Sequence, residues 1–378
     1  MPFSVSLCAS VVNRLFGSTR RSAIQGREFD VVTGAFGYTG KYITRRLLAM
    51  GRGVRTLTGH PDRGAAFNDD VTVAPLRFDR PEELVANLRG ASTLYNTYWV
   101  RFPRGEVTYE RAVENTRTLI NAAREAGVRR IVHLSITNPF AGSILGYFAG
   151  KSAIEQMIFD SGLAYAILRP TVIFGVEDVL INNIAWLLRH APVFAMPGSG
   201  EYSIQPIYVV DLAEMAVAAG RATGILPVPE HGQDGHGTMR VTGRTTGILP
   251  VLGHGQDGHG TTHDTSNPMQ ETPNIVLDAV GPEIYTFEEL VRLIAGKVGS
   301  RARIVHTPPW VALLLSRLVG IAVRDVVLTQ DEMKGLMAGL LVSKSAPTGR
   351  TRLSEWASRH AHLLGRRYAS ELDRHFRV

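Results

Sequence analysis

The chain has 378 residues, of which 44% are hydrophobic and 20% charged, the composition of a globular protein rather than a disordered one. A single cysteine, Cys8, excludes a disulfide framework and a cysteine metal cluster, and fits a reducing, cytoplasmic compartment. The formal net charge of +7 favours anionic ligands, but the arginines are scattered. An evenly solvated basic surface is therefore favoured over nucleic-acid binding.

Residues 1–27 contain four arginines and no acidic residue, and their apolar part has no charged segment before it. This argues against a secretory signal, so we expect a flexible leader, with a targeting segment as the alternative. No apolar run reaches the roughly 18 uncharged residues of a membrane-spanning helix. Residues 309–323 come nearest but contain Arg317. A buried helix is expected there, and contact of the C-terminal lobe with a membrane surface is the minority alternative.

The first element is a β-branched apolar run at residues 29–33, followed by Gly34, Gly37 and Gly40 and then by a segment with helical apolar spacing. Strand, glycine turn and helix form the context in which G-x-x-G-x-x-G indicates a dinucleotide site. The glycines allow a positive φ, a close approach of pyrophosphate and tight packing of helix on strand. The amino end of the helix then holds the phosphates. A βα turn without a ligand is the alternative.

After this unit, strands alternate with helices of about ten residues or more. The pattern predicts strands at 54–58, 71–76, 92–96, 130–134 and 164–168, and helices at 81–88, 109–126 and 145–161. Such alternation predicts right-handed βαβ units and an α/β, Rossmann-type doubly wound parallel sheet over residues 28–175.

Beyond residue 175 the pattern loosens, and residues 176–378 are expected to form a smaller, mostly helical substrate lobe that returns elements to the sheet. The predicted elements are helices at 178–190, 211–220 and 287–298 and strands at 203–209, 274–278 and 303–306. Thr286 and Glu289 form a capping box before the 287–298 helix.

The sequence of residues 223–238 recurs at 246–261, displaced by 23 residues. Two Gly-, His- and Pro-rich copies cannot bury a core, so we expect a disordered insert at 221–272. Its histidines lack a carboxylate partner set, so adventitious metal binding is a minority alternative and no metal site is predicted.

Tyr147 and Lys151 stand four residues apart at the start of the 145–161 helix, on one helical face. A lysine beside a phenol favours the phenolate and would prepare Tyr147 as a general acid or base. Ser135, at the end of the strand before it, can hydrogen-bond the reacting oxygen. A lone Y-x-x-x-K is weak evidence, and its weight here comes from the glycine motif upstream.

This combination resembles the short-chain dehydrogenase/reductase superfamily, in its extended and atypical branches. These include epimerase/dehydratase-like proteins, NmrA-like proteins and relatives of the nucleotide-binding accessory subunit of respiratory complex I. The match spans residues 29–211. The resemblance implies that Ser135, Tyr147 and Lys151 are the catalytic triad. It implies a cofactor site built from Gly34, Phe36, Gly37, Tyr38, Gly40, Asp79, Asn96, Thr97, Pro170, Thr171 and Val172.

Two departures from the family pattern bear on the cofactor. The fourth strand ends in YNTYWV, so the nicotinamide side is expected to be bulky. The second strand has no acid at its tip, where NAD-selective proteins bind the ribose 2′-hydroxyl. Arg55 and Arg63 could meet a 2′-phosphate, which favours NADP(H) over NAD(H). The alternative is that both arginines are solvated.

The substrate is expected to be a small molecule bound by residues after Gly175. Candidates are Asn182, Asn183 and Trp186 on one helix and Gln205, with Tyr202, on a later strand; packing roles are equally expected for them. The apolar second lobe favours a lipophilic substrate over a sugar nucleotide.

The leading reading is an NAD(P)-dependent oxidoreductase or epimerase-like enzyme in which Tyr147 transfers the proton. The contrasting reading is a non-catalytic NAD(P)H-binding protein, either a redox sensor of the NmrA type or a stabilising subunit as in complex I. Retention of all three triad residues favours the enzyme. The sequence leaves the oligomeric state open.

Overall fold

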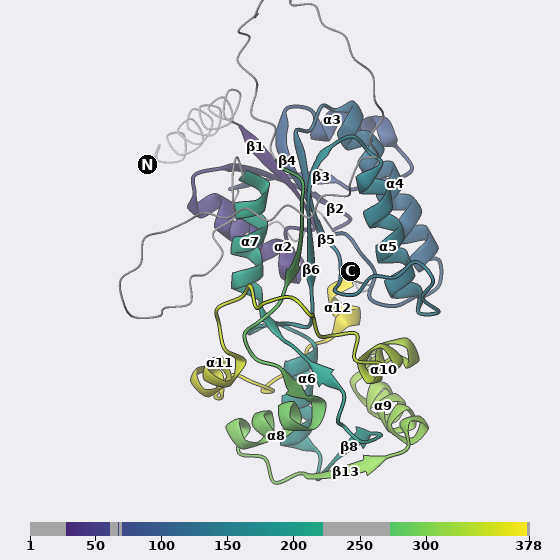
Figure 1. Cartoon of the computed structure of the whole chain (residues 1–378), viewed down its shortest axis with the longest axis vertical. Helices are drawn as coiled ribbons and strands as arrows, with labels where there is room; N and C mark the ends of the chain where they lie inside the picture. The colour runs from purple at the N-terminus through teal and green to yellow at the C-terminus, as the bar shows by residue number, and fades with distance from the viewer. Residues whose placement is uncertain (1–27, 61–66, 68–69, 222–272, 376–378) are drawn as a thin grey trace, which may run out of the picture.

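The computed structural model describes residues 28–60, 67, 70–221 and 273–375. The predicted leader, Arg63 and nearly all of the predicted insert lie outside these residues, which Figure 1 draws as a thin grey trace. The division of the chain at residue 175 stays a prediction.

A seven-stranded parallel sheet confirms the predicted α/β, Rossmann-type fold. Its order is β11-β6-β5-β4-β1-β2-β3. The strands are β1 (Phe29–Thr33), β2 (Gly53–Thr58), β3 (Val71–Pro75), β4 (Ala91–Asn96), β5 (Arg130–Leu134), β6 (Ala164–Pro170) and β11 (Ile275–Ala279). β11 comes from the second half of the chain and pairs with β6 at the sheet edge, with Leu277 opposite Leu168. This is the expected return to the sheet.

Helices cover both faces of the sheet, because its strands are apolar on both sides (Figure 1). On one face lie α2 (Tyr38–Ala49) and α7 (Val209–Arg221), which pack against each other. On the other lie α3 (Pro81–Leu88), α4 (Tyr109–Glu125) and α5 (Gly146–Phe159). Leu47 and Ala216 are buried in one layer and Leu119 and Ile154 in the other.

The second lobe lies beyond the carboxyl ends of the strands, in the lower half of Figure 1. Its helices are α6 (Leu180–His190), α8 (Phe287–Val298), α9 (Pro309–Val323), α10 (Gln330–Met337), α11 (Leu353–His360) and α12 (Glu371–His375). Three two-stranded pairs complete it: β7 (Ile173–Phe174) with β10 (Ile207–Tyr208), β8 (Val193–Pro197) with β13 (Arg303–Thr307), and β9 (Ser203–Ile204) with β12 (Tyr285–Thr286).

The second lobe differs in three ways from the predicted elements. Strands β8 and β12 were not predicted. The helix expected to be buried at 309–323 is α9, but its only buried residues are Ala312 and Gly320, so that expectation was wrong. The single strand expected at 203–209 is two short strands, β9 and β10, which pair with different partners. Pro206 stands between them and has no backbone N–H to continue a ladder. The predicted capping box is confirmed: Thr286 Oγ1 accepts from Glu289 N at 3.1 Å, and Glu289 Oε2 accepts from Thr286 N at 2.8 Å.

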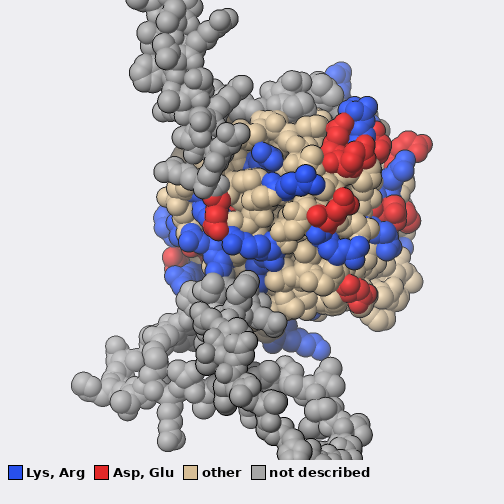
Figure 2. All heavy atoms as spheres, turned by 90° about the horizontal axis from the view of Figure 1, so that it is seen from above, with Lys and Arg blue, Asp and Glu red and all other residues tan. Residues whose placement is uncertain are grey.

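In the described part of the chain, no helix is both long enough and apolar enough to cross a bilayer. On the face seen in Figure 2, lysine and arginine side chains are interspersed with aspartate and glutamate, and no patch of one sign dominates the described surface.

Candidate functional site

The glycine loop has the geometry that its spacing predicted. Gly34 directly follows β1 with φ of +67°, a conformation that residues with a Cβ rarely adopt. A Cβ on Gly40 would lie 2.2 Å from the Gly34 carbonyl oxygen. The first turn of α2 can therefore pack this closely against the loop only because residue 40 is glycine. Gly37 is the N-cap of α2 and donates its N–H to Gly34 O at 2.8 Å. The amino end of α2 therefore lies at the loop, where its backbone N–H groups can bind an anion.

A cavity of about 800 Å³ lies over this loop. It is lined by the glycine loop, the tips of β2 and β4, and residues from the second lobe. The lining includes Gly34, Phe36, Gly37, Tyr38, Gly40, Lys41, Thr58, Gly59, His60, Phe78, Thr97, Tyr98, Trp99, Arg101, Tyr147, Glu177, Glu371 and Arg374. It lies at the carboxyl edge of the parallel sheet, between β1 and β4, where the strand order reverses. Ligands of such sheets bind at this position.

The end of β4 is fixed to the end of β1 by reciprocal hydrogen bonds. Thr97 N donates to Thr33 Oγ1 at 2.8 Å, and Thr97 Oγ1 donates to Thr33 O at 2.6 Å. Thr97 lines the cavity, whereas Asn96 points below it, with its Nδ2 3.1 Å from Nδ1 of the buried His133. Burial holds the pKa of His133 well below its usual range. Asn96 is therefore a support for the site and not a cavity residue.

Tyr147 and Lys151 lie on the first two turns of α5, as predicted, but in different surroundings. Tyr147 lines the cavity. Lys151 is 3% exposed, and its Nζ donates to the Leu134 carbonyl at 2.7 Å. Burial lowers the pKa of Lys151 to about 7 and raises that of Tyr147. The effect on Tyr147 opposes the lowered phenol pKa that the sequence led us to expect.

The indole of Trp99 covers this pair. Lys151 Nζ lies 4.7 Å from the centroid of the Trp99 ring. The same ring meets the Tyr147 ring edge-on at 5.6 Å and stacks on the Tyr109 ring at 5.8 Å, with 10° between the ring planes. A Cβ on Gly150 would lie 2.7 Å from the indole, so this glycine makes room for it. The bulky end of β4 predicted from the sequence is therefore a lid over Lys151.

Ser135 directly follows β5, and its backbone N–H donates to Leu168 O at 2.8 Å. Its side chain is buried, and Oγ has no partner among the described residues. Ser135 neighbours Leu134, whose carbonyl accepts from Lys151 Nζ. The structure thus brings Ser135, Tyr147 and Lys151 to one end of β5, while only Tyr147 faces the cavity.

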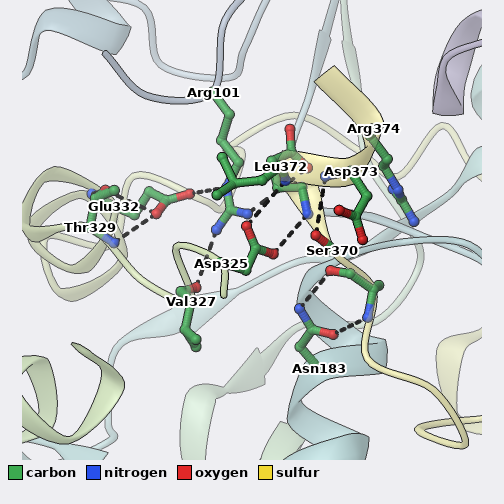
Figure 3. A network of polar contacts seen from close by, with 12 residues as sticks. Arg101, Asn183, Asp325, Val327, Thr329, Glu332, Ser370, Leu372, Asp373 and Arg374 are labelled. Atoms are coloured by element: carbon green, nitrogen blue, oxygen red, sulfur yellow. Dashed lines mark hydrogen bonds and ion pairs between the residues drawn. The ribbon is translucent and has the colours of Figure 1, made fainter. Parts of the chain in front are cut away.

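The C-terminal segment closes the other side of the cavity. Asp325 accepts the backbone N–H groups of Glu371 at 2.8 Å and Leu372 at 3.1 Å (Figure 3). Arg101 Nε donates to Glu332 Oε1 at 2.5 Å, and its Nη1 lies 4.0 Å from Glu371 Oε2. These contacts hold α12 between the sheet and the second lobe.

Two cations reach the cavity beside the glycine loop. Lys41, directly after Gly40, forms an ion pair of 2.7 Å with Glu177. Arg374 of α12 donates to the Glu177 carbonyl, and its guanidinium lies 5.9 Å from the Tyr38 ring centroid. Neither cation was predicted. Lys41 could have been found from its place in the first turn of α2, but nothing near Arg374 in the sequence points to this loop.

Several predicted cofactor residues do not line the cavity. Arg55 donates Nη1 to Asn87 O at 2.6 Å and lies 4.7 Å from the Phe29 ring centroid, so it supports α3 and does not reach the tip of β2. Asp79 is exposed. The remaining three, Pro170, Thr171 and Val172, are also absent from the lining, and Thr171 Oγ1 donates to the Gln205 carbonyl. Arg55 and Thr171 thus bond backbone groups of neighbouring segments, and a cofactor role for Asp79, Pro170 and Val172 stays a prediction.

The predicted substrate residues also serve packing and the backbone. Asn182 Nδ2 donates to Gly175 O at 3.1 Å, and Asn183 exchanges two hydrogen bonds with the Ala369 backbone. Gln205 donates to Gly281 O and accepts from Ser343 N. Trp186 stacks on His190 and meets Tyr368 edge-on, and Tyr202 donates Oη to Pro197 O. None of them lines the cavity over the loop.

Comparison with known proteins agrees with this geometry. Residues 34–178 match the family model described as NAD(P)H-binding. Subunit 9 of the mitochondrial NADH dehydrogenase (ubiquinone) 1 alpha subcomplex of Arabidopsis thaliana is 26% identical over 232 residues, 59% of this chain and 58% of that one. The 4-hydroxy-2-methyl-3-oxo-4-farnesyl-3,4-dihydroquinoline-1-oxide ketoreductase of Stigmatella aurantiaca is 26% identical over 222 residues, 51% of this chain and 65% of that one. The chain therefore spans about half to two thirds of these relatives.

Solved structures share the fold. The NADPH complex of an NADPH-dependent quinone oxidoreductase from Escherichia coli superposes with a TM-score of 0.62 at 20% identity, covering 88% of this chain and 99% of that one. A nucleoside-diphosphate-sugar epimerase from Staphylococcus aureus gives a TM-score of 0.61 at 15% identity, covering 87% and 99%.

Proposed function

We propose that the chain, whose residues 34–178 match an NAD(P)H-binding family model, is an NADP(H)-dependent oxidoreductase of the short-chain dehydrogenase/reductase type acting on a lipophilic carbonyl compound. The observation that carries this proposal is the shared cavity. Tyr147, the one residue of the triad that can exchange a proton with a bound molecule, lines the same 800 Å³ space as the glycine loop. A cofactor on the loop and a substrate beside Tyr147 would then be neighbours.

The residues around the loop fit a dinucleotide. Gly34 and Gly40 leave room that a Cβ would fill, and the amino end of α2 offers backbone N–H groups to a diphosphate. Lys41 and Arg374 add positive charge at the same wall. When bound, the nicotinamide cofactor would supply the hydride.

In this proposal the protein supplies the proton and the orientation. Tyr147 donates its hydroxyl proton to the carbonyl oxygen during reduction and takes it back during oxidation. Lys151 lies one turn further along α5 and stabilises the phenolate that remains. Ser135 Oγ, the third member of the predicted triad, is buried without a partner in the described chain and does not line the cavity.

The preference for NADP(H) now rests on the tip of β2 and not on Arg55. Thr58, Gly59 and His60 line the cavity there, and none carries a carboxylate. A carboxylate at this tip would repel a 2′-phosphate and bind a 2′-hydroxyl. Its absence supports NADP(H).

The lipophilic substrate is supported by apolar side chains in the cavity lining. Phe78, Tyr98, Trp99 and Val100 line the cavity, so a flat apolar molecule would bury its faces there. Two similar proteins, a quinone oxidoreductase and a ketoreductase of a farnesyl-bearing quinoline, have substrates of this kind.

A second function is favoured by one observation, the position of Trp99. The indole lies over Lys151, whose Nζ is already hydrogen-bonded to Leu134 O. If this arrangement persists with cofactor bound, the lysine cannot assist Tyr147, and the chain would bind NAD(P)H without turning it over. It would then act as a nucleotide-dependent stabilising subunit or sensor.

Binding and single-turnover measurements separate the two functions. NADPH and NADH affinities are measured by fluorescence titration, and NADPH oxidation is then followed with quinones, aryl ketones and sugar nucleotides. For the oxidoreductase we expect turnover on at least one apolar carbonyl compound or quinone. Tyr147→Phe should lower that rate by about 10²–10⁴-fold at unchanged NADPH affinity.

Tyr165→Phe is the matched control, because Tyr165 lies in β6, outside the cavity lining. It should leave the rate unchanged. Tight NADPH binding with no oxidation of any compound, in wild type and in Tyr147→Phe alike, would exclude the oxidoreductase function. The non-catalytic NAD(P)H-binding function would then be supported.

A further inference from the structure

Helix α9 (Pro309–Val323) presents its large apolar side chains to solvent. Trp310 is 68% exposed, Leu314 49%, Leu318 55% and Ile321 76%. Their spacing of four, four and three residues puts them on one face of the helix. In contrast, its buried positions are Ala312 and Gly320. The helix is therefore apolar on the outward face, the reverse of an ordinary surface helix.

This face is continuous and carries no negative charge. Residues 309–323 contain no acidic residue, and their single charged side chain is that of Arg317. Arg317 stands three residues before Gly320 and one before Leu318, at the margin of the apolar stripe. A stripe of this length on a monomer marks a surface that is covered in use.

Beside the stripe lies a groove of about 680 Å³ with basic walls. Arg104, Arg317 and Arg324 line it together with Ile321. The one acidic residue of the lining is Asp325, whose carboxylate accepts the N–H groups of Glu371 and Leu372. The groove thus joins positive side chains to the apolar face of α9.

We propose that α9 is a membrane-surface helix that lies on a bilayer containing anionic phospholipids, with its apolar face among the acyl chains and the arginine groove on the headgroups. Both parts of the surface fit this occupant. Apolar side chains with a tryptophan at one end are typical of helices that lie in the interface. Basic residues beside such a helix attract anionic lipid headgroups.

Charge favours the bilayer over a second copy of the chain. In a two-fold dimer through α9 the same surface would face itself, bringing each basic groove towards its symmetry mate. No acidic side chain on α9 would offset this repulsion. An anionic lipid surface instead meets every arginine with opposite charge. This inference does not depend on the proposed oxidoreductase activity.

Vesicle flotation with the full chain tests the proposal. We expect the protein to float with phosphatidylcholine vesicles that contain 30% phosphatidylglycerol, and to bind pure phosphatidylcholine much more weakly. The double variant Leu314→Glu, Leu318→Glu should lose more than about tenfold in affinity, because it removes two apolar side chains from the buried face. Arg317→Gln should lose about fivefold on anionic vesicles only.

Ile284→Glu is the matched control, since Ile284 is also an exposed large aliphatic residue (56%) but lies outside α9. It should bind vesicles as wild type does. Trp310→Phe supplies a second measurement: wild-type fluorescence should shift to the blue on anionic vesicles, and this shift should be absent in the variant. Circular dichroism and thermal unfolding of each variant verify that it has folded.

Three results would overturn the proposal. The first is no flotation with vesicles of either composition. The second is equal binding by the α9 double variant and wild type. The third is a dimer, detected by light scattering without lipid, that Leu314→Glu, Leu318→Glu abolishes; it would assign the surface to a second copy of the chain.

Discussion

The Trp99 indole lies with its centroid 4.7 Å from Lys151 Nζ, across 52 residues of sequence, and closes the lysine off beneath the cavity. This contact turns the end of β4 into a lid over α5. It decides whether the lysine can assist Tyr147, and it explains why α5 carries a glycine at position 150.

Gly150→Ala should destabilise the protein by about 1–3 kcal/mol, because the new Cβ would lie 2.7 Å from the indole. In a Trp99→Ala background the same substitution should be neutral or stabilising, since alanine is the better helix former. Chemical denaturation of the four proteins measures the coupling energy. Gly296→Ala in α8, where the new Cβ meets nothing within 4 Å, is the control and should stabilise by about 0.5–1 kcal/mol.

Lys151 should make stability rise with pH between about 7 and 10. Burial lowers its pKa to about 7, so in this window the unfolded chain binds a proton that the folded chain does not. Stability then increases as the pH rises, by at most about 1.4 kcal/mol per pH unit. Below pH 7 both states are protonated and the slope from this group vanishes.

Urea unfolding of wild type and Lys151→Met at pH 7.5, 8.5 and 9.5 measures this slope. The variant should lose it. Burial raises the pKa of Asp178 to about 7, so this group makes stability fall as the pH rises. That effect lies mainly below pH 7 and therefore outside the measured range. Equal slopes in the two proteins would show that Lys151 is protonated in the fold.

Cofactor preference should respond to the tip of β2 and not to Arg55. Gly59 is exposed, and a Cβ there would meet nothing within 4 Å, so Gly59→Asp should fold and place a carboxylate where NAD-selective proteins carry one. We expect NADPH affinity to fall by about tenfold or more, and NADH affinity to fall less.

Arg55→Ala serves as the contrast in the same titrations. It should leave the ratio of NADPH to NADH affinity unchanged. It should cost about 1–3 kcal/mol of stability, because Arg55 bonds Asn87 O and lies over the Phe29 ring. A selective loss of NADPH affinity in Arg55→Ala would contradict this placement.

Asp325 should couple the C-terminal segment to cofactor binding. Asp325→Ala leaves the N–H groups of Glu371 and Leu372 without their carboxylate, at a cost of about 2–4 kcal/mol. Because α12 brings Arg374 to the cavity, NADPH affinity should fall with it. Limited proteolysis should cut the variant earlier near the C-terminus, and NADPH should protect it less than wild type. Asp70→Ala, at an exposed position, should change neither property.

The local pattern of the sequence determined much of this protein. The spacing of Gly34, Gly37 and Gly40 fixes a βα turn, because positive φ and the absence of a Cβ are properties of the residues themselves. The alternation of strands and helices implied the parallel sheet, and Thr286 with Glu289 marked the start of α8. The glycine turn and the helix cap depend on residues close in the chain, and the order of strands and helices predicts the sheet although its strand pairs join distant segments.

Tertiary structure alone decided which side chains reach the cavity. Arg55 and Asn183 have the right chemistry for ligand contacts, but each satisfies a backbone group of a distant element, Asn87 or Ala369. Arg374 enters the cavity because Asp325 anchors α12 there. Burial also sets the pKa of Lys151, and burial depends on Trp99, which meets it only in the folded chain. Such long-range pairing has no local sequence signature.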